Sequence, residues 1–425
     1  MNQVRDWVEE TRLVDTHEHL IEEEQRLEAR LDPGLFPCDD WAFVFFHYLI
    51  DDLASAGMPE DARQRFLDPE STTEQKYLAI APWWERVKHT GYGQAVRIAL
   101  QGLYGEDDLT AESAPRIAEK YREWVRPGFY REILQGKCNL DHCQVNSLQE
   151  IFLESSQPDL LRQDLSILQL STDVDREFIE KEGAKNLDDW LGVIAQYFTK
   201  YAHRAVAVKS QCAYNRRLDF SAPDQSAAEG VFTRLASGKE LSPEELKPME
   251  DFLFDVCVRK ATEAGLPVKL HTGTYAGHGY MPMDRVRHNA SDLCPLLQRH
   301  PDARFVLMHI GFPYWHEMIA LAKHYPNAYV DMCWAWILSP GACVQFLKEY
   351  LLAAPVSKLF TFGGDYITVE PVYGHSRIAR MGIAQAVDEL VQEGWIRMEE
   401  AQVVIERIMH GNALEVFPRG SSAGA

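Results

Sequence analysis

Eight short apolar runs most constrain how this chain can fold. Each is too short for a helix, and most are rich in β-branched or aromatic residues, so we expect them to be strands. They lie at residues 13–17, 142–146, 165–170, 204–209, 267–271, 305–309, 328–332 and 359–363. Because the segments between them read as helices, the alternation predicts parallel strands joined by helical crossovers. Eight such strands favour an α/β fold of the (β/α)₈ TIM-like barrel type, with an open doubly wound sheet as the alternative.

The helical signals are clearest in the second half of the chain. Ser242-Pro243-Glu244-Glu245 is a capping box with proline at the first helical position. Gly265 then ends this helix, and Pro267 opens the next strand. Further helices are expected at residues 313–323, 340–352 and 378–394.

Residues 20–140 interrupt the alternation. They mix aromatic and charged residues and read as mostly helical. An insertion after the first strand of a barrel lies at the C-terminal mouth, where active sites lie, so we expect a cap over the site. A decorative helical subdomain or an oligomer contact is the alternative. The predicted organisation is therefore a barrel at 1–19 and 141–418, a helical insertion at 20–140 and a disordered tail at 419–425.

Composition excludes several classes of function. With 43 Lys+Arg against 64 Asp+Glu, the formal net charge is −21, which argues against binding to nucleic acid. No apolar run is long enough to span a membrane, and the charged N-terminus does not resemble a signal peptide. Eight cysteines without a CxxC pair suit free thiols in a reducing cytoplasm. We expect a cytoplasmic protein that binds a small molecule, and a homo-oligomer stays open.

Polar residues that could bind a metal stand at the ends of four predicted strands. His17 and His19 follow the first strand, and residues i and i+2 of a strand point the same way. His271 and His309 end the fifth and sixth strands, and Asp365 follows the eighth. Because an unpartnered buried polar group is costly, such a set indicates a site at the barrel mouth rather than neutral packing. Imidazole and carboxylate ligands suit a divalent ion, zinc first, with manganese or iron as alternatives.

Three motifs together resemble the amidohydrolase superfamily. They are VDTHEHL at 14–20, GGDY at 363–366 and MHGNALEVF at 409–417, with a histidine after the fifth and the sixth strand between them. The last motif is similar to the C-terminal end of the amidohydrolase-related branch. The resemblance covers nearly the whole chain outside the insertion, and it implies a distorted (β/α)₈ barrel with a divalent metal.

The resemblance also implies roles for the residues at the strand ends. His17, His19, His271 and Asp365 match the family's metal ligands, and Asp365 matches its general base. His309 matches a histidine that binds a second metal in binuclear members and polarises or protonates the substrate in mononuclear ones. A bound ion would lower the pKa of its water ligand toward about 7, and a nearby carboxylate would accept the proton.

Lys209 leaves the number of metal ions open. In binuclear members a carboxylated lysine at the end of the fourth strand bridges two ions. However, KSQCAYNRRLDF at 209–220 is similar to a segment of the amidohydrolase-like domains fused to glutamine synthetase. There Lys209, Tyr214 and Arg216 or Arg217 would line the substrate pocket, and a basic cluster would favour a substrate carboxylate. One ion is favoured over two, and solvated surface charge is the alternative for both arginines.

Three further residues are candidates for substrate contact. Tyr275 and His278 belong to the glycine-rich segment TGTYAGHGY, which follows the fifth strand. Such loops often close over a substrate, although a solvent-facing turn explains the pattern equally well. Trp334, just beyond the seventh strand, would supply an aromatic wall or simply pack under the barrel rim.

The sequence therefore predicts a metal-dependent hydrolase. Its substrate would be a small, carboxylate-bearing molecule with a C–N or C–O bond that metal-activated water cleaves. The same ligands support two alternatives, decarboxylation of an aromatic or enoic acid and isomerisation of a uronate, and the long insertion is similar to that of uronate isomerases. A catalytically silent barrel that only binds a ligand is the non-enzymatic alternative.

Overall fold

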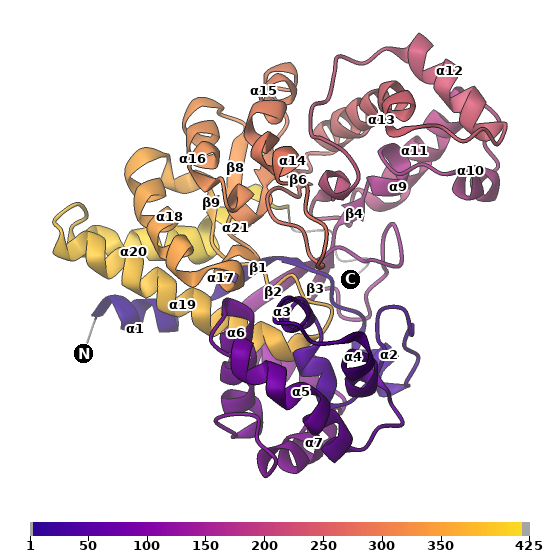
Figure 1. Cartoon of the computed structure of the whole chain (residues 1–425). Helices are drawn as coiled ribbons and strands as arrows, with labels where there is room; N and C mark the ends of the chain where they lie inside the picture. The colour runs from indigo at the N-terminus through magenta and orange to yellow at the C-terminus, as the bar shows by residue number, and fades with distance from the viewer. Residues whose placement is uncertain (1–2, 419–425) are drawn as a thin grey trace.

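The computed structural model describes residues 3–418, so the tail expected to be disordered at 419–425 lies outside the described residues. Parallel strands form the centre of the molecule, and helices surround them (Figure 1). The strands are β1 (Leu13–Glu18), β2 (Leu140–Val145), β3 (Leu161–Gln163), β4 (Leu165–Ser166), β5 (Val208–Ser210), β6 (Val268–Leu270), β7 (Phe305–Leu307), β8 (Ala328–Asp331) and β9 (Leu359–Phe360). Every paired neighbour is parallel.

Backbone hydrogen bonds join these strands into a ring of eight positions. β3 pairs with β2 and β4 pairs with β5, and only Asp164 separates β3 from β4, so the two occupy one position. The ring closes between β1 and the segment after β9, where Thr16 N donates to Phe362 O and Asp365 N donates to His17 O, both at 2.9 Å. This confirms the α/β barrel and excludes the open sheet.

The strand expected at 165–170 is wrong in its bounds. The chain is extended earlier, in β3 and β4, and residues Leu168–Ser171 instead form the short helix α9. Asp164 is a charged residue in the middle of this extended segment, so a search for apolar runs does not recognise the segment as a strand. Its carboxylate accepts from Lys269 Nζ at 2.8 Å inside the barrel, where both side chains are fully buried.

Local sequence signals explain where helices of the barrel begin, as α13 (Pro243–Glu263) shows. Ser242 and Glu245 form the expected capping box at the start of α13, with Pro243 in its first turn. Besides α9, the helices of this part are α1 (Gln3–Glu10), α10 (Arg176–Glu182), α11 (Leu187–Tyr201), α12 (Gln225–Ala236), α13 (Pro243–Glu263), α14 (Met283–Arg287), α15 (Asn289–Arg299), α16 (Trp315–His324), α17 (Ala335–Leu338), α18 (Pro340–Ala353), α19 (Val369–Gln392), α20 (Met398–Glu406) and α21 (Asn412–Val416). No described helix is both long and apolar enough to cross a membrane.

The chain between β1 and β2 is helical along most of its length. It contains α2 (Glu23–Leu27), a 3-10 turn (Trp41–Phe45), α3 (Leu49–Ser55), α4 (Glu60–Leu67), α5 (Thr73–Val87), α6 (Gly91–Ala99), α7 (Ser113–Trp124) and α8 (Phe129–Arg131). In Figure 1 these helices gather in one lobe, coloured indigo to purple, beside β1–β3. Within the lobe α6 also packs against α17 and α19 of the barrel, so the lobe is anchored next to the strand ends.

Candidate functional site

Three of the expected metal ligands converge at the seam where the barrel closes. His17 is the second-last residue of β1 and is fully buried, and His19 directly follows the strand. The Oδ1 atom of Asp365 lies 3.1 Å from His17 Nε2 and 3.3 Å from His19 Nε2. The ligand atoms of these three residues all lie within 4.8 Å of one another, which is a spacing that one ion can bridge.

A hydrogen bond orients His19 toward Asp365. His19 Nδ1 lies 2.6 Å from the backbone oxygen of Asn146, at the end of β2. A carbonyl oxygen only accepts, so Nδ1 carries a proton, and Nε2 is the ring nitrogen that faces Asp365. This is the arrangement that fixes the tautomer of metal-binding histidines.

Burial sets the charge states in the cluster. Burial lowers the pKa of His17 and of His309 well below the usual range, so both imidazoles are neutral near pH 7. Burial alone would raise the pKa of Asp365, but His17, His19 and His309 outweigh it and hold that pKa well below its usual range. Neutral imidazoles around an ionised carboxylate are the protonation states that metal binding requires.

His309 lies beside this cluster, next to Asp365. Its Nε2 atom is 3.9 Å from Asp365 Oδ2, and its side chain is fully buried. Neither ring nitrogen finds a hydrogen bond among the described residues, and His17 Nδ1 lacks one as well. Leaving such groups unmatched costs about 1–3 kcal/mol each. These orphaned atoms, together with the donor set, fit a bound ion and a substrate.

His271 lies outside the compact group, although the sequence places it among the ligands. It follows β6, and its Nε2 atom donates to Thr274 O at 2.9 Å. Its ring centroid lies 4.5 Å from that of His309 and 4.6 Å from that of Tyr214. In the part of the chain that the structure describes, the close groups of metal-binding atoms contain Asp365, His17, His19, His309 and Cys333, but not His271. The hydrogen bond to Thr274 commits one of its two nitrogens.

Asp365 is held in a strained turn that depends on two glycines. Its φ angle is +64°, in the left-handed region. A Cβ atom on Gly364 would collide with the Glu18 carboxylate, and one on Gly363 would lie 2.7 Å from Cys333 Sγ. Glu18 Oε2 accepts from Tyr366 N at 2.7 Å, so the residue between His17 and His19 stabilises the turn. The motif GGDY is thus needed for the position of the carboxylate.

The inserted lobe contributes an aromatic wall that the sequence did not reveal. Tyr48, in the lobe, donates a 2.6 Å hydrogen bond to the backbone oxygen of Asp365. Its ring stacks on Trp334 at 4.7 Å and on Tyr92 at 5.4 Å. Trp334 in turn meets His309 edge-on at 5.6 Å. Trp334 therefore lies where the sequence predicted a wall, whereas nothing local distinguishes Tyr48 and Tyr92 from the many other aromatic residues of the lobe.

Comparison with known proteins identifies the family. The family model described as amidohydrolase matches residues 205–419, which is half of the chain. The chain belongs to the amidohydrolase family. The barrel of this amidohydrolase, with its inserted lobe, is also similar to solved structures along nearly its whole length.

The similar structures share the fold at low sequence identity. Uronate isomerase of Thermotoga maritima superposes with a TM-score of 0.77 at 16% identity, over 98% of this chain and 96% of the other. Glucuronate isomerase of Caulobacter crescentus gives 0.75 at 16% identity, over 97% and 92%. A Lactobacillus casei protein described as a candidate metal-dependent hydrolase gives 0.69 at 15% identity, over 98% and 97%.

A curated relative matches the sequence itself. Protein fluG of Emericella nidulans is 26% identical over 223 residues, which is 50% of this chain. The match spans only 25% of the fluG sequence, so the matched half of the amidohydrolase corresponds to about a quarter of that relative's length.

A cavity of about 710 Å³ lies between the inserted lobe and the glycine-rich loop that follows β6. The inserted lobe lines one side with Asp51, Asp52 and Tyr92, and the glycine-rich loop 273–281 lines the other. Asp51 bridges the two sides, because Oδ2 accepts from Gly277 N at 2.8 Å and Oδ1 lies 3.2 Å from His278 Nδ1. Asp51 therefore joins the lobe to the loop.

The expected substrate residues of this loop face different ways. Tyr275 stacks on Tyr214 with ring centroids 4.8 Å apart, and its hydroxyl donates to Ala213 O at 2.5 Å. Tyr214 also contacts the ring of His271. Both tyrosines thus pack between the loop and the ring of His271. His278 instead lies at the outer rim, where its side chain is half exposed.

The basic mouth expected from Arg216 and Arg217 is not formed. Arg216 is buried and pairs with Glu250 at 2.8 Å and with Asp251 at 2.5 Å. Arg217 binds Asp292 through two nitrogens, at 3.0 and 2.6 Å. Carboxylates of α13 and α15 thus neutralise both guanidinium groups, so neither adds an uncompensated positive charge to the mouth.

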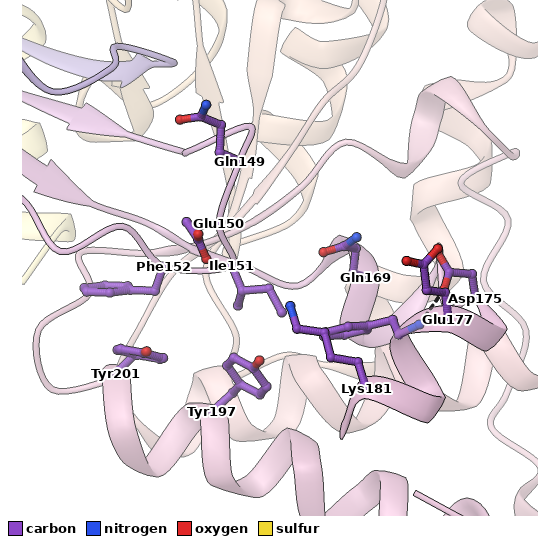
Figure 2. Close-up of a pocket in the computed structure, with 11 residues that line it drawn as sticks. Gln149, Glu150, Ile151, Phe152, Gln169, Asp175, Glu177, Lys181, Tyr197 and Tyr201 are labelled. Carbon is purple, nitrogen blue, oxygen red and sulfur yellow. Dashed lines mark hydrogen bonds between the residues drawn. The ribbon is translucent and has the colours of Figure 1, made fainter. Parts of the chain in front are cut away.

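A second cavity, of about 350 Å³, lies away from these residues. It is formed by the loop after β2 together with α9, α10 and α11, and Figure 2 shows Phe152 and Tyr201 lying face to face along it. None of its lining residues is a candidate metal ligand. The chemistry is therefore assigned to the cluster of His17, His19, His309 and Asp365.

Proposed function

We propose that this amidohydrolase is a metal-dependent hydrolase that cleaves a C–N or C–O bond of a small molecule. The observation that best supports the proposal is the convergence of His17, His19 and Asp365 beside the unpartnered, fully buried His309. The carboxylate-bearing substrate expected from the sequence loses its basis, because both arginines that suggested it are already paired.

The proposed metal site uses His17, His19 and Asp365, and a single zinc ion is our first choice. A bound divalent ion lowers the pKa of a water molecule toward neutrality and so supplies a nucleophile. Lys209 Nζ lies 3.3 Å from His17 Nε2, and burial lowers its pKa. A lowered pKa favours the neutral amine, which CO₂ can carboxylate, and the carboxylated Lys209 and His309 would then hold a second ion if two are bound.

The proton steps are assigned to this chain's own side chains. Asp365 stays ionised and would accept a proton at one carboxylate oxygen, then return it to the leaving group. His309 is neutral and would donate a hydrogen bond from one ring nitrogen to the substrate carbonyl. Tyr48, Trp334 and Tyr92 shield these groups from water, which strengthens both interactions.

Isomerisation of a uronate is the second candidate. The likeness to the two uronate and glucuronate isomerases extends over 97–98% of this chain, the inserted lobe included. Such a reaction would use Asp365 as a base on a carbon-bound or hydroxyl proton, with no net uptake of water.

Two measurements test the proposal. Elemental analysis should find about one zinc, manganese or iron per chain in the wild type, none in His17→Ala, and the wild-type value in the control His316→Ala, whose side chain is 68% exposed. Two ions would favour a carboxylated Lys209, and no metal uptake at all would contradict the proposal. Mass spectrometry of the products then separates the reactions, because hydrolysis adds water, isomerisation leaves the mass unchanged and decarboxylation releases CO₂.

A further inference from the structure

Three neighbouring strands of the barrel are followed by residues with the same unusual backbone conformation. His309 follows β7, Cys333 follows β8 and Asp365 follows β9, and their φ angles are +61°, +39° and +64°. Residues other than glycine seldom adopt this left-handed region, and such strain is typical of functional sites. The backbone is therefore strained at the three positions whose side chains meet.

These side chains form a second group of metal-binding atoms beside the first group, which is His17, His19 and Asp365. A ring nitrogen of His309, Cys333 Sγ and a carboxylate oxygen of Asp365 all lie within 4.8 Å of one another. His309 Nε2 is 3.9 Å from Asp365 Oδ2. The other oxygen, Oδ1, is the one that lies near His17 and His19. The carboxylate thus presents one oxygen to each group.

The buried ring of His309 points to a bound ion. Its side chain is fully buried, and neither ring nitrogen has a hydrogen-bond partner among the described residues. Cys333 is fully buried as well, and its backbone N donates to Asp331 Oδ1 at 3.0 Å. Thr16 Oγ1 donates to the other oxygen of Asp331 at 2.6 Å. The barrel interior therefore holds the thiol in place next to an imidazole that lacks a partner.

We propose that His309, Cys333 and Asp365 bind a second divalent ion, in addition to the ion assigned to the first group. The inference deepens the proposed function and rests on it, because both positions share the carboxylate of Asp365. Imidazole, thiolate and carboxylate are all zinc ligands, and three protein ligands leave a position for water or substrate. As the sulfur–metal bond forms, the thiol releases its proton to the solvent. A sulfur ligand favours zinc over magnesium, calcium or manganese.

The second position is the weaker of the two, because two cations side by side repel each other. It fills when the ion is supplied in excess. It also differs from a second position built on carboxylated Lys209, which belongs to β5, whereas Cys333 follows β8. Lys209 Nζ lies beside the first group, 3.3 Å from His17 Nε2, and would become a ligand only after reaction with CO₂. The two alternatives are separable because only Cys333 supplies sulfur.

Titration of the metal-free protein with excess Co²⁺ at pH 7 tests the inference. Cobalt replaces zinc at such sites, and a thiolate ligand adds a sulfur-to-cobalt charge-transfer band in the near ultraviolet. The wild type should bind about two Co²⁺ per chain and show the band. Cys333→Ala should bind about one and lack the band. Cys343→Ala is the matched control, because it removes another fully buried thiol, on α18, and it should behave as the wild type does.

Several outcomes would overturn the inference. Two ions without the band would assign the second one to Lys209, and a band that survives in Cys333→Ala would belong to another thiol. A single ion that shows the band would mean one shared position. If Cys333→Ala does not fold, cadmium NMR of the wild type decides, because a sulfur ligand moves the cadmium resonance far downfield of the range for nitrogen and oxygen ligands. A wild type without such a resonance would refute the sulfur ligand.

The same titration separates this inference from the proposed function. A single Co²⁺ without the band, lost in His17→Ala, would refute only the second position and leave the proposed hydrolase centre intact. A wild type that binds no Co²⁺ at all would refute both.

Discussion

Replacing Tyr48 with phenylalanine tests whether the inserted lobe holds Asp365 in place. The lost hydroxyl donates a 2.6 Å hydrogen bond to a buried backbone oxygen of Asp365. An unmade buried hydrogen bond costs about 1–3 kcal/mol. If Asp365 is a metal ligand, we expect about 1–2 kcal/mol of this to be lost from metal binding, which raises the metal Kd by about 5–30-fold. Changes of this size are typical when a partner of a metal ligand is removed.

The assay is competition for zinc between the protein and a chromogenic chelator. Tyr92→Phe is the matched control, because Tyr92 belongs to the same aromatic stack but has no hydrogen bond to the 363–366 turn. The control should bind zinc as the wild type does. A Kd for Tyr48→Phe within twofold of the wild type, with only a lower melting temperature, would refute the positioning role and leave a purely structural one.

Three further predictions concern the same turn and the barrel interior. Asp365→Asn keeps the shape but cannot accept a proton, so kcat/KM should fall more than tenfold, and a smaller loss would contradict its role as base. Gly364→Ala forces a Cβ into the Glu18 carboxylate and should lower both zinc affinity and melting temperature, whereas Gly192→Ala, in open space on α11, should not. Burial raises the pKa of Asp331 to about 7, so its carboxyl stabilises the fold only at low pH, and this contribution is lost as the pH rises through about 7. Asp331→Asn should therefore gain melting temperature relative to the wild type between pH 5 and pH 8, and a difference that does not change with pH would count against this.

The sequence reveals most of the barrel because its signals are local. Apolar runs mark the strands, and the capping box at Ser242 marks the start of α13. The prediction from sequence fails where a structural feature depends on a residue far away in the chain. Asp164 looks like a loop residue, and only Lys269, more than a hundred positions away, explains why it lies inside a strand position.

The same distinction holds for the candidate site. His17, His19 and Asp365 could be recognised because polar residues at strand ends are unusual in any sequence. Arg216 could not be read correctly, since the carboxylates that neutralise it lie on another helix, 34 and 35 residues further on. No local sequence pattern identifies Tyr48, because its contact with Asp365 depends on how the inserted lobe packs against the barrel.

The barrel closes at Asp365 through contacts between residues that lie far apart in the sequence. The hydrogen bond from Thr16 to Phe362 joins residues 346 positions apart, and His17 and Asp365 are separated by almost the same length. Contacts of such high sequence separation form late, because a long loop must be ordered first. During translation the histidine pair therefore emerges from the ribosome long before its carboxylate. A fragment restricted to residues 205–419 would carry Asp365 without His17 and His19, so it would fold, if at all, without the ability to assemble this centre.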